Sequence, residues 1–229
     1  MMLVTREAAA AVSREEAITY ALRVVAHTQL IDPEFLQRCM KTAAAEAEGG
    51  TPGFGVMLEQ DATEFLAMLQ HVKGCRSALE IGSRFGRSMQ CIAAYLEPKS
   101  RVVAVDLPYS GGYGDRPPPE PILRESMRKL GEVGFDVNLF LGDSHNSDLV
   151  EKVRTLGPFD FCFIDGDHSY EGVKADWENY GPMAKTVAFH DIVNNTGCFK
   201  LWNEIKKDYR HVEYTSSLWL GIGVLFKDN

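Results

Sequence analysis

From residue 77 onward, short apolar runs alternate with longer segments that have the spacing of amphipathic helices. Several of the runs are rich in β-branched or aromatic residues, and they occupy positions 78–81, 102–105, 138–141, 159–164 and 187–189. They lack a strict alternation of apolar and polar residues, which is typical of strands buried on both faces. The pattern therefore predicts an α/β protein with a parallel, doubly wound sheet and helices on each side.

The two ends of the chain follow different patterns. Residues 211–215 and 218–226 are extended runs joined by a short turn, which predicts a terminal antiparallel hairpin. Residues before 77 have helical spacing, with helix starts at Ser13, Asp32 and Asp61. We expect an N-terminal helical extension over residues 1–58 and a second domain over 59–229. The apolar faces of the N-terminal helices predict a homo-oligomer.

Composition limits the classes of partner and the compartment. The chain has 229 residues, of which 45% are hydrophobic and 24% are charged, as in ordinary globular proteins. Its net charge of −8 disfavours a nucleic-acid partner. The longest apolar stretch, 219–226, is too short to cross a membrane, and charged residues interrupt the N-terminus before a secretory signal can form. Five widely spaced cysteines without a CxxC motif suit a reducing compartment, so we predict a cytoplasmic protein.

The turn after the first predicted strand carries the first candidate ligand site. It reads EIGSRFGRS over residues 80–88, which is neither a GxGxxG fingerprint nor a P-loop. Gly82 permits a sharp turn, and Gly86 permits close approach of a ligand to the following helix. The carboxylate of Glu80 would repel a pyrophosphate but would accept hydrogen bonds from an ammonium group. This turn therefore predicts an amino-acid ligand rather than a dinucleotide.

The next two strands end in residues that suit a nucleoside. Asp106 can accept hydrogen bonds from two ribose hydroxyls, and Leu107 can pack on a purine. Asp143 and Ser144 follow the third strand and could contact an adenine edge. Because parallel strands place their carboxyl ends at one edge of the sheet, the three strands together predict S-adenosylmethionine as the cofactor.

These motifs carry a family resemblance. LEIGSRFGRS, VVAVD, GDS, FDFCFIDGDHSYEGVKAD and FHD resemble motifs of the class I S-adenosylmethionine-dependent methyltransferases, over about residues 77–195. The likeness is closest to the catechol-type O-methyltransferases and to a related group that includes sugar and antibiotic methyltransferases. It implies a Rossmann-like sheet of seven strands, mostly parallel, with an antiparallel last strand. The cofactor-binding positions, to which we add Ser83 of the same loop, are then Glu80, Gly82, Gly86, Ser88, Asp106, Ser144 and Asp165.

The resemblance also implies a catalytic centre. In the catechol-type enzymes a magnesium ion is held at the positions of Asp165, His190 and Asp191, and the base lies at the position of His168. This sequence departs from that pattern, because His168 replaces a lysine and His190 replaces a carboxylate. Magnesium prefers oxygen ligands, whereas manganese, iron or zinc would accept a histidine. The alternative is that His190 and Asp191 orient the His168 base without a metal.

The favoured hypothesis is methylation of a hydroxyl on a small molecule, such as a sugar or a natural product, with His168 as base. Two alternatives remain open: a module that binds the cofactor without catalysis, and a dinucleotide-dependent enzyme on a related fold. The segment from Pro108 to Pro121 is rich in glycine and proline, which is typical of a mobile lid or of a plain surface loop.

Overall fold

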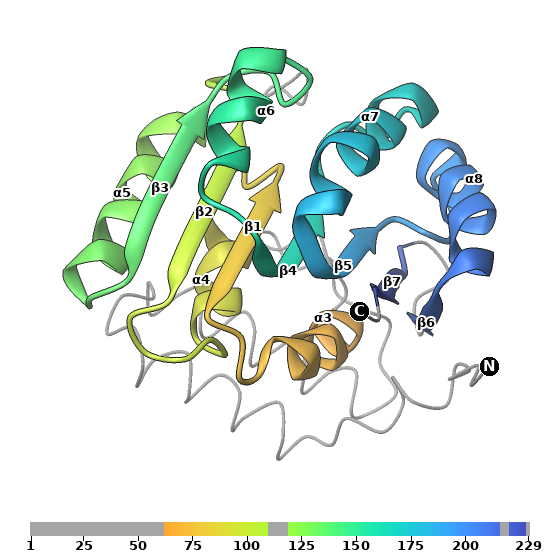
Figure 1. Cartoon of the computed structure of the whole chain (residues 1–229), viewed down its shortest axis with the longest axis horizontal. Coiled ribbons are helices and arrows are strands. Elements are labelled where there is room, and N and C mark those ends of the chain that lie inside the picture. Colours follow the sequence, from red (N-terminus) through yellow and green to blue (C-terminus); the bar gives the residue numbers. More distant parts are fainter. Residues whose placement is uncertain (1–61, 110–118, 216–219, 228–229) are drawn as a thin grey trace.

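The computed structural model describes residues 62–109, 119–215 and 220–227, which form one sheet between two layers of helices (Figure 1). The sheet has seven strands in the order β3-β2-β1-β4-β5-β7-β6. β7 is antiparallel to both of its neighbours, and the other pairs are parallel. The strands are β1 (Ser77–Ile81), β2 (Arg101–Asp106), β3 (Asp136–Leu141), β4 (Phe159–Ile164), β5 (Ala184–His190), β6 (Arg210–Tyr214) and β7 (Ile222–Phe226).

The helices divide between the two faces of the sheet (Figure 1). One face is covered by α3 (Ala62–Leu69), α4 (Arg87–Ala93) and α5 (Pro119–Glu132). The other is covered by α6 (Ser147–Arg154), α7 (Tyr170–Tyr180) and α8 (Thr196–Ile205). Short 3-10 turns follow α3, α7 and α8, at Gln70–Val72, Gly181–Met183 and Lys206–Asp208.

Successive strand residues contribute to different cores, as the sequence pattern predicts. Phe161 and Phe163 of β4 pack with α3, α4 and α5, whereas Cys162 and Ile164 pack with the opposite layer. Both layers exclude water from the central strands, because these four side chains are all at most 2% exposed. The prediction of a doubly wound sheet with an antiparallel last strand is therefore confirmed.

The chain changes direction across the sheet between β1 and β4. From β1 it proceeds to β2 and β3 on one side, then returns to β4 and β5 on the other. In such sheets ligands bind beyond the carboxyl ends of the strands at this switch point. Backbone hydrogen bonds join the loops there: Gly82 N donates to Val105 O (2.9 Å), and Asp165 N donates to Ile81 O (2.9 Å). The candidate ligand-binding residues therefore lie at one edge of the sheet, in loops that backbone hydrogen bonds hold together.

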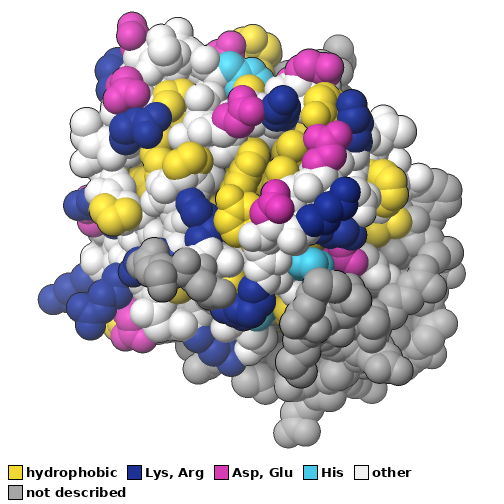
Figure 2. Space-filling model, turned by 45° about the vertical axis from the view of Figure 1, so that its right-hand side comes forward, with side chains coloured by type: hydrophobic (Ala, Val, Ile, Leu, Met, Phe, Trp, Pro, Cys, Tyr) yellow, Lys and Arg dark blue, Asp and Glu magenta, His cyan; other side chains and the backbone are white. Residues whose placement is uncertain are grey.

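Two further predicted elements are present in the fold. The helix expected from Asp61 is present as α3, and the terminal pair β6 and β7 is antiparallel as predicted. The predicted helices within residues 1–58, and most of the candidate lid, lie outside the described residues; Pro119 and Pro121, at the end of that segment, belong to the first turn of α5. Among the helices described, none is long and apolar enough to span a bilayer. On the described part of the face in Figure 2, basic and acidic side chains are interspersed.

Candidate active site

Glu80 lies at the centre of the switch point and is the most unusual charged residue there. Its side chain is fully buried, and neither carboxylate oxygen makes a hydrogen bond with a described residue. Burial raises the pKa of Glu80 to about 8; the nearby hydroxyls of Ser83 and Ser88 lower it in part, and the charges of Asp165 and Asp106 raise it further. A buried carboxyl group without a partner is costly, so its position favours a ligand that brings a positive charge.

The two glycines of the β1 loop are required for different reasons. Gly82 has φ +88°, and a Cβ there would lie 2.1 Å from the carbonyl oxygen of Asp165. Gly86 has φ +76°, and a Cβ there would lie 2.9 Å from the Cβ of Ser126 on α5. The sequence predicts that Gly86 allows a ligand to approach closely. The structure shows a reason in the packing, because a side chain at this position would clash with α5. Arg84 between them also has a positive φ of 45°, as found in loops held by their surroundings.

Asp106 ends β2 beside this loop. Its Oδ2 accepts a hydrogen bond from the backbone N–H of Arg84, which ties the β1 loop to the end of β2. Burial raises the pKa of Asp106 to about 6, while the hydrogen bonds from Arg84 and Leu107 act against this shift. The predicted ribose acceptor is therefore a partly buried carboxylate next to Glu80.

The loop after β3 holds Asp143 and Ser144. Asp143 Oδ1 accepts from the backbone N–H of His145 (2.8 Å), and its side chain is 65% exposed. The N-cap of α6 is Asn146 rather than Asp143. Ser144 is held from α7, since its hydroxyl donates to Asp176 Oδ1 (2.7 Å). Gly142 N donates to Asp106 O (2.8 Å), which places this loop beside the end of β2.

The end of β5 and the loops after β4 and β5 bring two histidines and two carboxylates together. His190 Nδ1 lies 3.0 Å from Asp165 Oδ1 and 3.5 Å from Asp191 Oδ1. His168 Nδ1 lies 3.0 Å from Asp191 Oδ2, and its Nε2 lies 3.4 Å from Asp165 Oδ1. Asp191 has φ +59°, a left-handed backbone conformation that is uncommon for residues other than glycine and that clusters at functional sites. We name these four residues the His–Asp cluster.

Charge pairing within the His–Asp cluster outweighs the effect of burial. Burial raises the pKa of Asp165, but the two imidazoles hold it well below the ordinary range. Burial lowers the pKa of His168, yet the hydrogen bond and charge of Asp165 and the charge of Asp191 bring it above its usual value. The pKa of His190 is also raised, because Asp165, Asp191 and Glu64 together outweigh its burial. The cluster therefore favours charged imidazoles.

The cluster also contains a group of atoms that suits a metal ion. Donor atoms of Asp165, His168 and Asp191 all lie within 4.8 Å of one another. This set differs from the sequence-predicted one, which contains His190 in place of His168. His190 Nδ1 faces Asp165, whereas its Nε2 is buried and makes no hydrogen bond with a described residue.

Sequence reasoning missed two buried carboxylates near the site. Glu64 on α3 is fully buried, and its Oε2 accepts from the backbone N–H of Gly221 (2.9 Å). Asp176 on α7 is also fully buried and receives the Ser144 hydroxyl. A signal for Asp176 was present, because a charged residue falls on the apolar helix face that carries Val173 and Tyr180.

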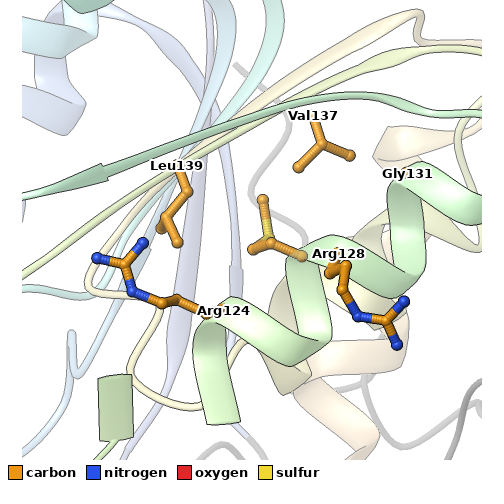
Figure 3. A pocket seen from close by; sticks show the side chains of 6 residues that line it. Arg124, Arg128, Gly131, Val137 and Leu139 are labelled. Atoms are coloured by element: carbon orange, nitrogen blue, oxygen red, sulfur yellow. The ribbon is translucent and has the colours of Figure 1, made fainter. Parts of the chain in front are cut away.

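A groove of about 310 Å³ lies elsewhere, between α5 and the edge strand β3 (Figure 3). It is lined by none of the predicted site residues, and its charged members are engaged with neighbours: Arg124 with Glu120, and Arg128 with Glu125 and Glu132. The chemistry-bearing residues are therefore those at the switch point and not those of this groove.

Comparison with known proteins agrees with this geometry. Residues 79–192, about half of the chain, match the model of a methyltransferase domain family. No curated protein matches the sequence. The fold is similar to that of an O-methyltransferase from Bacillus cereus solved in complex with SAH. That structure has a TM-score of 0.56 and 19% identity, and the match covers 93% of this chain and 100% of that one.

Two further structures resemble the fold. TomG of Streptomyces achromogenes, an O-methyltransferase of tomaymycin synthesis solved with SAM, has a TM-score of 0.55 and 14% identity, with 94% of this chain and 99% of that chain covered. CalS11, a TDP-rhamnose 3'-O-methyltransferase of calicheamicin biosynthesis, has a TM-score of 0.56 and 21% identity, with 95% and 96% covered. The match to the methyltransferase family model, together with the motifs and the sheet order, places the chain in the family of class I S-adenosylmethionine-dependent methyltransferases.

Proposed function

We propose that the enzyme transfers a methyl group from S-adenosylmethionine to a hydroxyl of a small molecule, of the sugar or natural-product type. The names of the similar structures support oxygen as the acceptor, since they are O-methyltransferases, one of them acting on a nucleotide-linked sugar. The observation that carries the proposal is the buried carboxyl of Glu80, which makes no hydrogen bond with the described residues and lies near Asp106 and Asp165. Three carboxyl groups at one edge suit a sulfonium and an ammonium and would repel phosphates.

The cofactor would lie across the ends of three strands. Its amino-acid part would meet Glu80 and the β1 loop, and its ribose would meet Asp106. Its adenine would lie against Leu107 and the loop after β3, and its sulfonium methyl would face Asp165. The residues assigned to this binding site are Glu80, Gly82, Ser83, Gly86, Ser88, Asp106, Leu107, Asp143, Ser144 and Asp165.

The chemical step is an in-line displacement. The acceptor oxygen forms a bond to the methyl carbon while the carbon–sulfur bond breaks, and its electron pair remains on sulfur as a neutral thioether. The hydroxyl proton passes to His168 Nε2, because the contact of Nε2 with Asp165 Oδ1 (3.4 Å) is longer than that of Nδ1 with Asp191 Oδ2 (3.0 Å). Alignment of oxygen, carbon and sulfur supplies the larger part of the rate, up to about 7–11 kcal/mol in favourable systems.

The environment of His168 sets when it can act as a base. Its raised pKa means that it carries a proton over more of the neutral range than a free histidine does. A base must first lose that proton, so turnover should rise with pH through the raised pKa of His168 and then level off.

A divalent metal ion is the alternative use of the His–Asp cluster, because a ring nitrogen of His168 that binds a metal cannot also take the hydroxyl proton. Asp165, His168 and Asp191 offer carboxylate oxygens and one imidazole nitrogen, a set that suits manganese, iron or zinc better than magnesium. When bound, such an ion would lower the pKa of the acceptor hydroxyl. Loss of turnover in EDTA, restored by manganese, would support the metal; unchanged turnover would support orientation of His168 by Asp191 alone.

Cofactor binding tests the proposed site directly. We expect Asp106→Ala to weaken S-adenosylhomocysteine about 10- to 100-fold in calorimetric titration, because buried ribose hydroxyls lose a charged acceptor. Titration with NAD is the comparison that addresses the dinucleotide alternative, and no binding is expected. Unchanged affinity in Asp106→Ala, or tight binding of NAD, would refute the assignment.

Three features remain predictions. They are the boundary between an N-terminal extension over 1–58 and the catalytic domain over 59–229, the homo-oligomer, and the cytoplasmic location.

A further inference from the structure

Asp176 is a buried carboxylate that the proposed mechanism does not use. It lies on α7, and its side chain is fully buried. Oδ1 accepts the hydroxyl hydrogen bond of Ser144 (2.7 Å) and lies 3.3 Å from Nε2 of His145. The hydrogen bond to Asp176 is the main reason that the pKa of His145 rises to about 9, so His145 carries a positive charge at neutral pH.

The other oxygen of Asp176 faces a different loop. Oδ2 lies 3.1 Å from the position that a Cβ on Gly166 would occupy, so the carboxylate packs directly against the loop after β4. It makes no hydrogen bond with any described residue. Burying a carboxylate costs free energy that its partners must offset, and Ser144 and His145 both contact Oδ1 rather than Oδ2. The contacts with Ser144 and His145 thus account for one oxygen of Asp176, and the contact with Gly166 concerns the other.

A second residue of α7 acts on the same loop. The hydroxyl of Tyr180, one helical turn after Asp176, donates to the carbonyl oxygen of Ser144 (2.7 Å). Ser144 is thus held at its side chain by Asp176 and at its backbone by Tyr180. Of these two side chains, Asp176 also packs against Gly166, so it contacts the loops after both β3 and β4.

We propose that Asp176 is a positioning residue for the cofactor, which fixes the Ser144–His145 segment relative to the Asp165–Gly166 segment. This inference rests on the proposed function, because it takes Ser144 and Asp165 as parts of the cofactor site. Asp176 acts through these two loops and not by contact with the cofactor. Its loss should therefore reduce cofactor affinity while leaving the chemistry at the His–Asp cluster in place.

The test compares binding with turnover in Asp176→Asn. The amide keeps the shape of the side chain and an acceptor for Ser144, but it removes the negative charge beside His145. We expect affinity for S-adenosylhomocysteine to fall about tenfold or more, as for loss of a charged hydrogen bond. We expect kcat at saturating S-adenosylmethionine to change less than about threefold, and the pKa of His145, followed by NMR, to return toward the ordinary value of about 6.5. A purely architectural residue would not separate affinity from kcat in this way.

Tyr180→Phe is the matched control, because it removes one hydrogen bond to Ser144 and leaves Gly166 and His145 untouched. We expect it to weaken cofactor binding less than about threefold. If Asp176→Asn binds the cofactor as well as Tyr180→Phe does, while Asp106→Ala binds poorly, the inference is wrong and the proposed cofactor site stands. If Asp106→Ala also binds normally, the proposed site fails and the inference with it.

A second variant keeps the test decisive if Asp176→Asn does not fold. His145→Gln removes the positive charge at a side chain that is 32% exposed, and such positions tolerate substitution. We expect the same separation of affinity from kcat with a smaller loss, about three- to tenfold. Unchanged affinity in this variant would overturn the inference.

Discussion

Glu80 and Asp165 are buried carboxyl groups at the ends of neighbouring strands, yet their surroundings shift their pKa values in opposite directions. Glu80 has no hydrogen-bond partner among the described residues, and burial raises its pKa to about 8. Asp165 lies beside two imidazoles of the chain itself, and these outweigh burial and lower its pKa. Among the described residues, the carboxyl group on the β1 side of the switch point thus makes no hydrogen bond, whereas the one on the β4 side lies beside two imidazoles.

This difference separates the two tasks of a methyltransferase. A carboxyl group that makes no hydrogen bond with the described residues gains a partner when a positively charged ligand binds, so Glu80 is suited to affinity. A group that already orients an imidazole is suited to the chemical step, as Asp165 and Asp191 are toward His168. We expect three measurable differences, one on each side of the switch point and one at Gly82 between them.

The largest effect is expected on the β4 side, from His168→Ala. Removing the proposed base should lower turnover about 10²- to 10⁴-fold. Affinity for S-adenosylhomocysteine should change little, because His168 pairs with Asp165 and Asp191 rather than with the proposed cofactor contacts. Single-turnover kinetics and calorimetry measure the two quantities separately.

His211→Ala provides the control for a general effect of losing a histidine. His211 lies on β6 at the far edge of the sheet, and its Nδ1 contacts the carbonyl oxygen of Tyr209. We expect its turnover to stay close to that of the parent enzyme. Equal turnover in the two variants would remove His168 from the mechanism.

The sheet, and the placement of the candidate site residues at one edge of it, could be predicted from the sequence, because each depends on local patterns. Apolar runs located the strands, and parallel strands bring Glu80, Asp106 and Asp165 to one edge whatever the details of packing. The direction of each side chain could not be predicted. The donor atoms that could hold a metal come from His168 and not His190, and this depends on which ring nitrogen faces which carboxylate. The packing of Gly86 against α5 likewise depends on the tertiary structure.

Pairs that are distant in sequence were also beyond prediction. Asp176 and Ser144 are 32 residues apart, and only the packing of α7 on the sheet brings them together. Glu64 and Gly221 are 157 residues apart. The pattern of polar and apolar residues can show that a charged residue such as Asp176 falls on a buried helix face, but it does not identify the partner of that residue.

An intermediate effect is expected at the junction of the two sides, from Gly82→Ala. The new Cβ would lie 2.1 Å from the carbonyl oxygen of Asp165, which is backbone and has little freedom to move. Together with the strain of a positive φ, we expect a loss of at least about 3 kcal/mol in the free energy of unfolding. Urea denaturation measures this loss.

Gly74→Ala is the matched control for the conformational part of that loss. Gly74 has a similar φ of +82°, but a Cβ there would meet nothing within 4 Å. We therefore expect a loss of only about 1–2 kcal/mol. Equal losses in the two variants would mean that the loops after β1 and β4 move apart at little cost, and that the junction is not rigid.

The smallest effect is the pH dependence of binding on the β1 side. In the free protein Glu80 holds a proton up to its pKa of about 8, whereas a bound ammonium group would favour the ionised form. Affinity for S-adenosylhomocysteine should therefore fall as the pH decreases below 8, by less than about tenfold per pH unit, with release of a proton on binding. Asp106, whose pKa is about 6, confines a clean measurement to the range above that value. Calorimetry in two buffers of different ionisation enthalpy measures the number of protons released.

The variant Glu80→Gln should bind S-adenosylhomocysteine more weakly at pH 8 and lose the pH dependence. A parent enzyme whose affinity does not vary between about pH 6.5 and 8 would show that Glu80 meets no cation.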